Sequence, residues 1–261
     1  MIKPELARSQ PKGMFNRIPV LVFDDVAVGL NLRGARGVCF NSDQLQAYLD
    51  WIDRWGFTPI TFEDFRFFLG GELNLPRRPI ILTFDWGSRK IFDIAFPILK
   101  EYGMRAVVFV IGDREMKTIR MDLIGGPLEY ELLGPHQIME MHSFGFEIGS
   151  LTMTHADLTG LSPEQCRYEI TRSRMTLEIL LNAPVQAFAY PYGKLTPALK
   201  SMVEEAGYAV AVARDSGPKE FGRDLMEVRR IQIGGGTTSF GLAVRTFSSL
   251  VGLSPGLLGR K

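Results

Sequence analysis

The sequence predicts an α/β fold in which helices connect the strands of one parallel sheet, and the sheet curls into a closed or nearly closed barrel. Strand-like and helix-like segments alternate about seven times along the chain, which is typical of this class. Several strand-like segments are continuously apolar, as expected of strands covered on both faces. No stretch rich in Pro, Gly or Ser divides the chain. We therefore predict a polar N-terminal extension over residues 1–17 and a single barrel domain over 18–261.

Strands are predicted where short apolar runs lie between turn-forming residues. These runs are residues 18–23, 57–60, 80–84, 106–111, 146–149, 187–189, 208–212 and 228–233. An irregular stretch is expected between about residue 112 and the helix that begins at Pro135.

Helices are predicted where apolar residues recur at helical spacing between capping signals. Ser42 is expected to cap the first helix, Thr61 the second, and Ser162 with Gln165 forms the capping box of the longest one. The predicted helices are residues 43–55, 62–69, 91–102, 135–144, 163–181, 197–207 and 242–252.

Composition narrows the classes of function. The 30 Lys and Arg against 29 Asp and Glu leave a formal charge of +1, which argues against broad electrostatic binding of nucleic acid. Cys39 and Cys166 are too few for a disulfide framework and lack the spacing of metal ligands. The polar start has no apolar segment typical of a signal peptide, so we expect a cytoplasmic protein. No apolar run approaches the ~18 residues that span a bilayer, so no membrane insertion is expected.

Polar residues that directly follow the strands of a parallel barrel gather at the rim formed by the carboxyl ends of the strands, where chemistry is usually sited. Four such segments are expected to meet there. They are Asp24-Asp25, Asp85 to Arg89, Ser150 to His155, and Tyr190 to Gly193.

Three of these segments resemble the ordered motif blocks of the polysaccharide deacetylase (NodB-homology) family. Leu82-Thr-Phe-Asp-Trp-Gly87 is similar to the first block, Glu147 to His155 to the second, and Phe188-Ala-Tyr-Pro-Tyr-Gly193 to the third. The resemblance extends from about Ile18 to Ile231. It implies a deformed (β/α)7 barrel of the NodB-homology type, which agrees with the alternation of strands and helices.

Members of this family hydrolyse N-acetyl groups on sugar polymers with a divalent metal held by one Asp and two His. The resemblance places Asp85 at the catalytic base and His155 at the second ligand imidazole. Trp86 stands where the family has its ligand Asp, and Leu151 where it has the first His, and neither side chain can coordinate a cation. No His follows His155 to protonate the leaving amine. We therefore expect no metal cofactor and no metal-dependent deacetylation.

One alternative keeps a divalent metal, re-sited near Asp25, Asp85 and His155. The competing interpretation is that Asp24 and Asp25 cap the following segment or pair with arginines of the rim.

The other rim residues also have more than one interpretation each. His155 is a catalytic remnant, a proton shuttle hydrogen-bonded to Asp85, or an inherited structural histidine. Trp86 and Tyr192 form an aromatic platform for a sugar ring, or they fill the space that the metal ligands have vacated. Arg89 could bind an anionic ligand or remain solvated. We expect the substrate-binding residues to be Trp86, Arg89, Tyr190, Pro191 and Tyr192, and the catalytic residues to be Asp85 and His155.

The first hypothesis is a polysaccharide-deacetylase-like pseudoenzyme of carbohydrate metabolism that binds a carbohydrate or assists a polysaccharide pathway. The alternative is an active hydrolase of non-peptide carbon–nitrogen bonds in a small amide or N-acetyl sugar. It would use Asp85 as general base, either without metal or with an altered metal site. A third interpretation is a scaffold that uses the exterior of the barrel, for which the sequence offers no particular surface.

Overall fold

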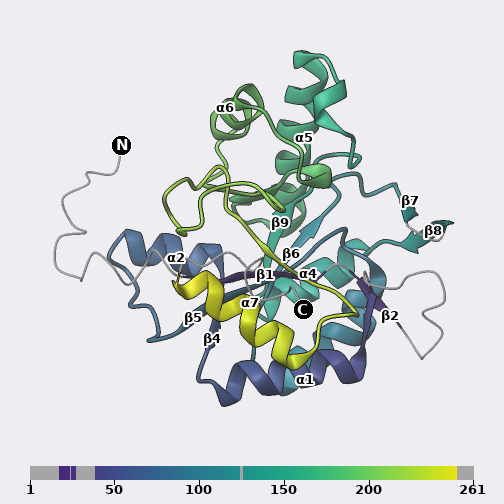
Figure 1. The fold of residues 1–261 in the computed structure, drawn as a ribbon. Helices are drawn as coiled ribbons and strands as arrows, with labels where there is room; N and C mark the ends of the chain where they lie inside the picture. Colours follow the sequence, from purple (N-terminus) through teal and green to yellow (C-terminus); the bar gives the residue numbers. More distant parts are fainter. Residues whose placement is uncertain (1–17, 24, 28–38, 124–125, 252–261) are drawn as a thin grey trace.

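A curled parallel sheet forms the centre of the protein, shown in Figure 1. The structure, a computed structural model, describes residues 18–23, 25–27, 39–123 and 126–251. The strand order is β11–β10–β9–β6–β5–β1–β12, with β4 beside β5, and the pairings between these strands are parallel. The strands are β1 (Val20–Phe23), β4 (Thr58–Ile60), β5 (Pro79–Phe84), β6 (Val107–Val110), β9 (Glu147–Ser150), β10 (Ala187–Ala189), β11 (Val210–Val212) and β12 (Ile231–Ile233).

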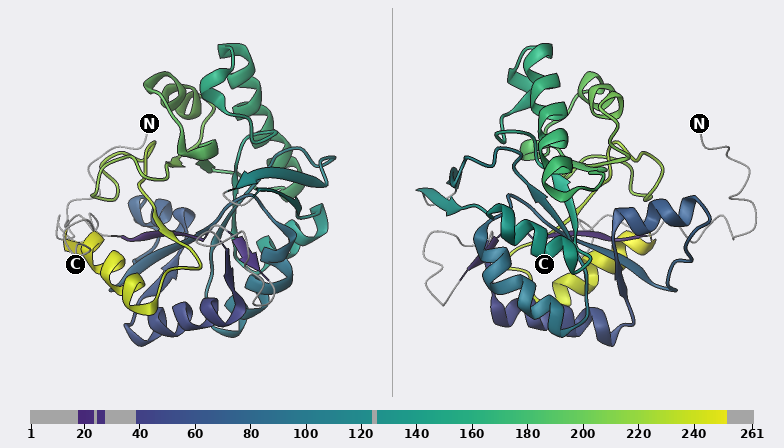
Figure 2. Two further views of the ribbon diagram at one scale, coloured as in Figure 1. Left: turned by 45° about the vertical axis from the view of Figure 1, so that its right-hand side comes forward. Right: turned by 180° about the vertical axis from the view of Figure 1, so that it is seen from behind.

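Helices connect the strands and cover the outer face of the sheet. They are α1 (Ser42–Arg54), α2 (Phe62–Leu69), α3 (Phe96–Glu101), α4 (Pro135–Ser143), α5 (Pro163–Leu181), α6 (Pro197–Glu205) and α7 (Ser239–Val251), with short helical turns η2 (Ile91–Ala95), η3 (Leu158–Gly160) and η4 (Pro191–Gly193). Both views in Figure 2 show α7 beside α1 and α6 beside α5. Within the described residues, no helix is both long and apolar enough to cross a membrane.

The predicted fold class is confirmed. The two ends of the strand order, β11 and β12, are not paired with each other, and a bridge between Val212 and Val228 narrows the gap between them. The sheet is therefore a nearly closed, deformed barrel. Residues 1–17 lie outside the described residues, so the proposed N-terminal extension stays a prediction.

Three helix starts differ from the sequence-based expectation, and one of them is that of α7, which begins at Ser239 instead of Leu242. Asn41, not Ser42, caps α1, because the Asn41 side chain accepts a hydrogen bond from the Gln44 amide while the Gln44 side chain accepts one from the Asn41 amide. The helix expected over 91–102 begins as the π-helical turn η2 before it becomes α3. The caps predicted at Thr61 and Ser162 are confirmed.

The stretch expected to be irregular after β6 contains an antiparallel hairpin of β7 (Thr118–Leu123) and β8 (Gly126–Glu131). The signal was present in the sequence, since apolar Ile119, Met121 and Leu123 alternate with polar residues before a Gly-Gly pair. A second small sheet that the sequence analysis missed pairs β2 (Asp25–Ala27) with β3 (Cys39–Asn41) in parallel.

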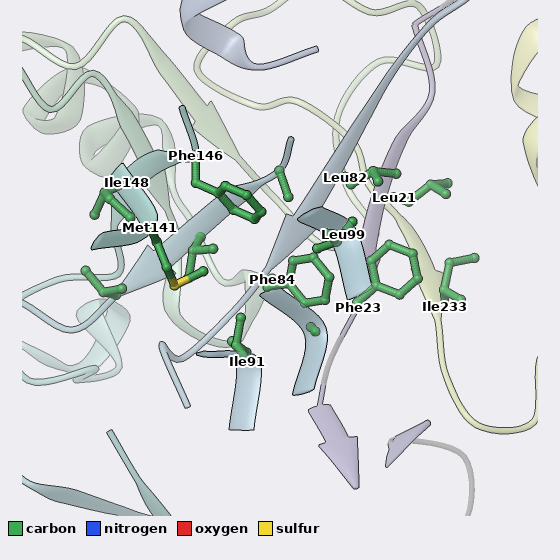
Figure 3. Close-up of a cluster of buried hydrophobic side chains, with 14 of the residues drawn as sticks. Leu21, Phe23, Leu82, Phe84, Ile91, Leu99, Met141, Phe146, Ile148 and Ile233 are labelled. Atoms are coloured by element: carbon green, nitrogen blue, oxygen red, sulfur yellow. The ribbon is translucent and has the colours of Figure 1, made fainter. Parts of the chain in front are cut away.

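Two apolar clusters occupy the two faces of the curled sheet. The larger cluster fills the space between the sheet and the helices, and Figure 3 shows part of it around Phe23 and Phe84. These two rings stack with their centroids 5.1 Å apart. The smaller cluster fills the barrel interior, where Val20 and Ile81 alternate with the outward-facing residues of the same strands. The barrel is thus packed with apolar side chains on both faces of the sheet.

Candidate functional site

The carboxyl ends of β5, β9 and β10 carry three of the predicted site segments. Asp85 follows β5, Leu151 follows β9, and Tyr190 follows β10. The neighbouring strands hold these ends in register, since Val110 pairs with Ser150 and Ser150 with Phe188. The structure therefore places the three segments at one rim, as the parallel topology predicts.

Asp85 is held by a buried arginine. Both terminal guanidinium nitrogens of Arg230 donate to the carboxylate, Nη1 to Oδ1 at 2.6 Å and Nη2 to Oδ2 at 2.8 Å. The side chain of Arg230 is 2% exposed and that of Asp85 is 14% exposed. Arg230 also donates from Nε to the Ala213 carbonyl and lies near the Thr83 hydroxyl. Such a two-pronged ion pair fixes the plane of the carboxylate and engages both of its oxygens.

Arg230 was missed by the sequence analysis, although a signal was available. Arg229 and Arg230 lie just before β12, and consecutive residues of an extended segment point to opposite sides. One of the two arginines therefore had to face the barrel interior. A buried guanidinium requires a carboxylate partner, and Asp85 was the candidate at the rim.

Trp86 is buried within the barrel interior. The residue is 7% exposed, and its ring lies 5.5 Å from that of Tyr130 in the β7–β8 hairpin. The hairpin is also tied to the same segment by the hydrogen bond from the Leu133 amide to the Gly87 carbonyl and by the bridge between Ser88 and Leu132. Trp86 therefore joins the hairpin to the rim, and its burial favours the space-filling interpretation over the platform.

Leu151 belongs to the same interior cluster as Trp86 and Tyr130 and is 1% exposed. The two positions at which the resemblance implies metal ligands are thus filled by apolar side chains that are packed together. Apolar side chains packed in this way stabilise the fold through burial.

His155 is held in a tightly organised loop. Its amide donates to the Thr152 hydroxyl, and the adjacent Thr154 donates both its amide and its hydroxyl to the buried carboxylate of Glu169. The imidazole is 4% exposed, and Nδ1 has no hydrogen-bond partner in the described part of the chain. No hydrogen bond joins it to Asp85 among these residues, so the geometry does not support the proton shuttle in its hydrogen-bonded form.

Burial lowers the pKa of the His155 imidazole to about 4, although the carboxylates of Asp85 and Glu169 act in the opposite direction. The imidazole is consequently neutral near pH 7. The imidazole ring lies beside the ring of Tyr192, with 4.7 Å between the centroids. Tyr192 is 51% exposed, so it presents an accessible aromatic surface beside the buried histidine.

The other predicted binding residues are placed differently. Pro191 is buried in η4. Tyr190 packs with Phe188 in the cluster beneath the helices and donates its hydroxyl to the Met226 carbonyl, which gives it a packing position outside the barrel interior. Arg89 is exposed and forms ion pairs with Asp93 and Glu131. Tyr192 is the predicted binding residue with the most accessible ring.

The rim also concentrates backbone strain. Trp86, Thr152, His155 and Tyr192 adopt positive φ angles of 71°, 62°, 61° and 58°. Residues other than glycine rarely adopt this region, at a cost of about 1–3 kcal/mol each. Strain of this kind tends to gather at functional sites.

The residues at the rim do not fit the metal that the resemblance implies. Trp86 and Leu151 have no donor atom suited to a divalent cation, which leaves His155 as the one family ligand. Both oxygens of Asp85 are engaged by Arg230. Among the residues that the structure describes, no group of three or more His, Cys, Asp or Glu is arranged to hold a metal ion. Asp24 lies outside the described residues and the Asp25 side chain is not described, so the re-sited metal stays a prediction.

Solved structures with a similar fold come from several bacteria. The Streptococcus pyogenes deacetylase PplD, solved in complex with acetate, superposes with a TM-score of 0.77 at 24% identity, over 88% of this chain and 98% of PplD. BC0361, a polysaccharide deacetylase from Bacillus cereus, gives a TM-score of 0.71 at 24% identity, over 88% of this chain and 69% of that one. At these identities the likeness establishes a shared fold.

The sequence comparisons establish the family. The protein YxkH of Bacillus subtilis (strain 168), whose name places it among the polysaccharide deacetylases, is 24% identical over 220 residues, which cover 84% of this chain and 72% of YxkH. The family model described as polysaccharide deacetylase matches residues 72–211, more than half of the chain and the part that carries Asp85, His155 and Tyr192. This chain therefore belongs to the polysaccharide deacetylase family.

Proposed function

We propose that this protein is a pseudoenzyme of the polysaccharide deacetylase family that binds carbohydrate, or assists a polysaccharide pathway, without metal-dependent deacetylation. One observation carries the proposal. The two positions that lack the family's metal ligands, Trp86 and Leu151, are buried together in an apolar cluster. Apolar packing at both positions supports the loss of a cation site there.

The chemistry that metal would supply is not replaced by the remaining groups. Without a metal, a water molecule keeps a pKa near ~15.7 instead of ~7. A general base alone contributes about 10²–10⁴-fold, which is far from sufficient for amide hydrolysis. Asp85 must also share its oxygens with the guanidinium of Arg230. The rim is therefore better suited to holding a ligand than to cleaving it.

Carbohydrate binding is supported by the accessible aromatic surface at the rim. The half-exposed ring of Tyr192 lies against the imidazole of His155, whose Nδ1 makes no hydrogen bond within the described residues. Aromatic rings pack against the apolar faces of sugars, while nearby polar atoms take up hydroxyl and amide groups. The combination fits one sugar unit of a polymer.

Calorimetric titration with chitin-type oligomers, together with an assay for released acetate, tests this proposal. We expect wild-type protein to bind the oligomers and to release no acetate, with or without added zinc, nickel or cobalt. Tyr192→Ala should weaken binding, whereas Tyr168→Ala, which removes another exposed tyrosine on α5, should leave it unchanged. Acetate release by the wild type, or binding that is insensitive to Tyr192→Ala, would contradict the proposal.

A second candidate is an active hydrolase of a non-peptide carbon–nitrogen bond that uses Asp85 as general base. It is favoured by the buried His155, which lies near enough to Asp85 to interact with its charge and whose Nδ1 has no hydrogen-bond partner among the described residues. An assay on chromogenic acetamides decides between the two. Turnover by the wild type that falls by at least about 10²-fold in Asp85→Asn would support the hydrolase. Rates at background for both the wild type and Asp85→Asn would contradict the hydrolase.

A further inference from the structure

A groove of about 1080 Å³ lies outside the barrel interior, between α6 and the segment that follows β11. A regular (β/α) barrel has a helix after each strand, but the chain runs from β11 to β12 through residues 213–230 without a described helix. Figure 1 shows this segment passing beside α6. The groove therefore occupies a place in the outer layer that a helix would otherwise fill.

The lining of the groove mixes polar and apolar side chains, and its charges are balanced. It includes three cationic side chains, Lys194, Lys200 and Arg223, and three anionic ones, Glu204, Asp224 and Glu227. A surface with equal numbers of both signs attracts neither polyanions nor polycations strongly.

An ion-pair network makes part of this lining rigid. The ammonium group of Lys200 bonds the carboxylates of Asp224 and of Glu227, the latter at 2.9 Å. These groups thus present fixed hydrogen-bonding atoms. Ser216 also lines the groove, and its enclosed Oγ makes no hydrogen bond within the described part of the chain. Preorganised donors and acceptors of both kinds suit a ligand with many hydroxyl groups.

One end of the groove adjoins the rim. Gly193 and Lys194 line the groove and directly follow Tyr192 in the chain. The ammonium of Lys194 lies 5.7 Å from the centroid of the Tyr192 ring and bonds Asp157 at 2.5 Å. Lys194 therefore borders both the exposed ring and the groove.

We propose that this groove is a second binding subsite, which takes the continuation of an uncharged oligosaccharide whose first sugar lies on Tyr192. The inference rests on the proposed carbohydrate binding and adds a direction and a length to it. A ligand of two sugars would occupy the rim alone, whereas a longer one would also reach the space between α6 and residues 216–227.

Titration calorimetry with a chitin-type dimer and hexamer tests the groove. Ser201→Trp and, independently, Thr159→Trp place a large ring in the groove at exposed positions of α6 and η3. Ala198→Trp is the matched control, because Ala198 is exposed on α6 and does not line the groove. Loss of a few hydrogen bonds corresponds to about tenfold in affinity.

We expect the wild type to bind the hexamer about tenfold more tightly than the dimer. Each blocking variant should lower hexamer affinity to that of the dimer and leave dimer affinity unchanged, while Ala198→Trp changes neither. Unchanged hexamer binding in both blocking variants, with Tyr192→Ala still weakening the binding of dimer and hexamer, would contradict the subsite in the groove but not the proposed function. Failure of the wild type to bind either oligomer would overturn both.

Discussion

Arg230 and Asp85 form a buried ion pair at the rim of the barrel. The Arg230 guanidinium is almost fully enclosed, and its hydrogen bonds to Asp85 and to the Ala213 carbonyl satisfy it there. Burying two charges is costly, so such a pair adds little net stability, but removing one partner leaves an uncompensated charge. The pair therefore constrains the rim more strongly than its net energy suggests.

Arg230→Met should lower the free energy of unfolding by about 3–5 kcal/mol, because it leaves the Asp85 carboxylate without its partner. Urea denaturation measures the change. The control is Arg229→Met, which removes an exposed neighbour that donates one hydrogen bond to the Gly217 carbonyl and should cost about 1 kcal/mol. Equal effects of the two substitutions would show that the buried ion pair does not have the role described.

The depressed pKa of His155 predicts a loss of stability in acid. An unfolded histidine titrates near 6.5, whereas burial lowers the folded value to about 4. As the pH falls, His155 is protonated in the unfolded chain before it is protonated in the folded one. The contribution of the neutral imidazole to folding stability is therefore complete above pH 6.5 and is lost as the pH falls toward 4, by up to about 3 kcal/mol.

Unfolding of the wild type and of His155→Gln, measured from pH 7.5 to 4, isolates this contribution. The wild type should lose stability relative to the variant across that window, and NMR should show a neutral imidazole at pH 5.5. His136→Gln, at an exposed position, is the control and should follow the wild type. A His155 resonance that titrates near 6.5 would contradict the assignment.

At the scale of elements, the amino end of β9 anchors α2. The Glu147 carboxylate, half-buried at the start of β9, accepts a hydrogen bond from the Glu63 amide in the first turn of α2. Burial raises the pKa of Glu147 to about 8, with the charges of Glu63 and Asp64 adding to the effect and backbone hydrogen bonds opposing it. Arg105 pairs with Asp64 beside this contact.

Glu147→Gln should stabilise the protein at alkaline pH. An unfolded glutamate ionises near pH 4.5. The contribution of Glu147 to the stability of the wild type is therefore complete below that pH and is lost as the pH rises through about 8. Gln keeps an oxygen for the Glu63 amide without a charge to desolvate. The expected gain is on the order of 2 kcal/mol at pH 9 and vanishes near pH 4.5, as thermal and urea unfolding would show. A gain independent of pH would contradict this explanation.

The packing of β9 against its neighbours depends on a glycine. A Cβ added at Gly149 would lie 2.5 Å from the Phe109 ring and 3.1 Å from the Ala187 carbonyl oxygen. Gly149→Ala should therefore cost about 1–3 kcal/mol through overpacking, measured by denaturant unfolding. Gly160→Ala is the matched control, because nothing lies within 4 Å of its added Cβ. If Gly149→Ala leaves the free energy of unfolding unchanged, β6 and β10 can shift to accommodate the added Cβ, and the overpacking explanation is wrong.

At the scale of the whole molecule, local signals predicted most of the barrel. Apolar runs located the strands, and caps such as Thr61 and Ser162 located helix starts, because both signals act over a few residues. The position of Arg230 beside Asp85, 145 residues away in the chain, is set by closure of the sheet and was not predicted. The groove beside α6 likewise depends on the absence of a described helix after β11, which no motif marks.

The candidate site was predicted in part for the same reason. The motif blocks located Asp85, His155 and Tyr192 at one rim. How deeply each rim residue is buried, which bears on its role, could not be predicted from these blocks. Trp86 and Tyr192 looked equivalent as aromatic residues after strands, yet Trp86 is 7% exposed and Tyr192 is 51% exposed. That difference arises from the β7–β8 hairpin, whose Tyr130 covers Trp86, and the hairpin was not predicted.

We propose that the apolar side chains of Trp86 and Leu151 stand in place of the family's cation site. Elemental analysis by mass spectrometry of purified wild-type protein, dialysed after exposure to zinc, nickel and cobalt, tests it most directly. The double variant Trp86→Asp with Leu151→His serves as the comparison that restores both family ligands. We predict well under one metal ion per wild-type chain and a higher content in the double variant where it folds. One tightly held metal ion per wild-type chain, with acetate released from chitin-type oligomers, would contradict the account.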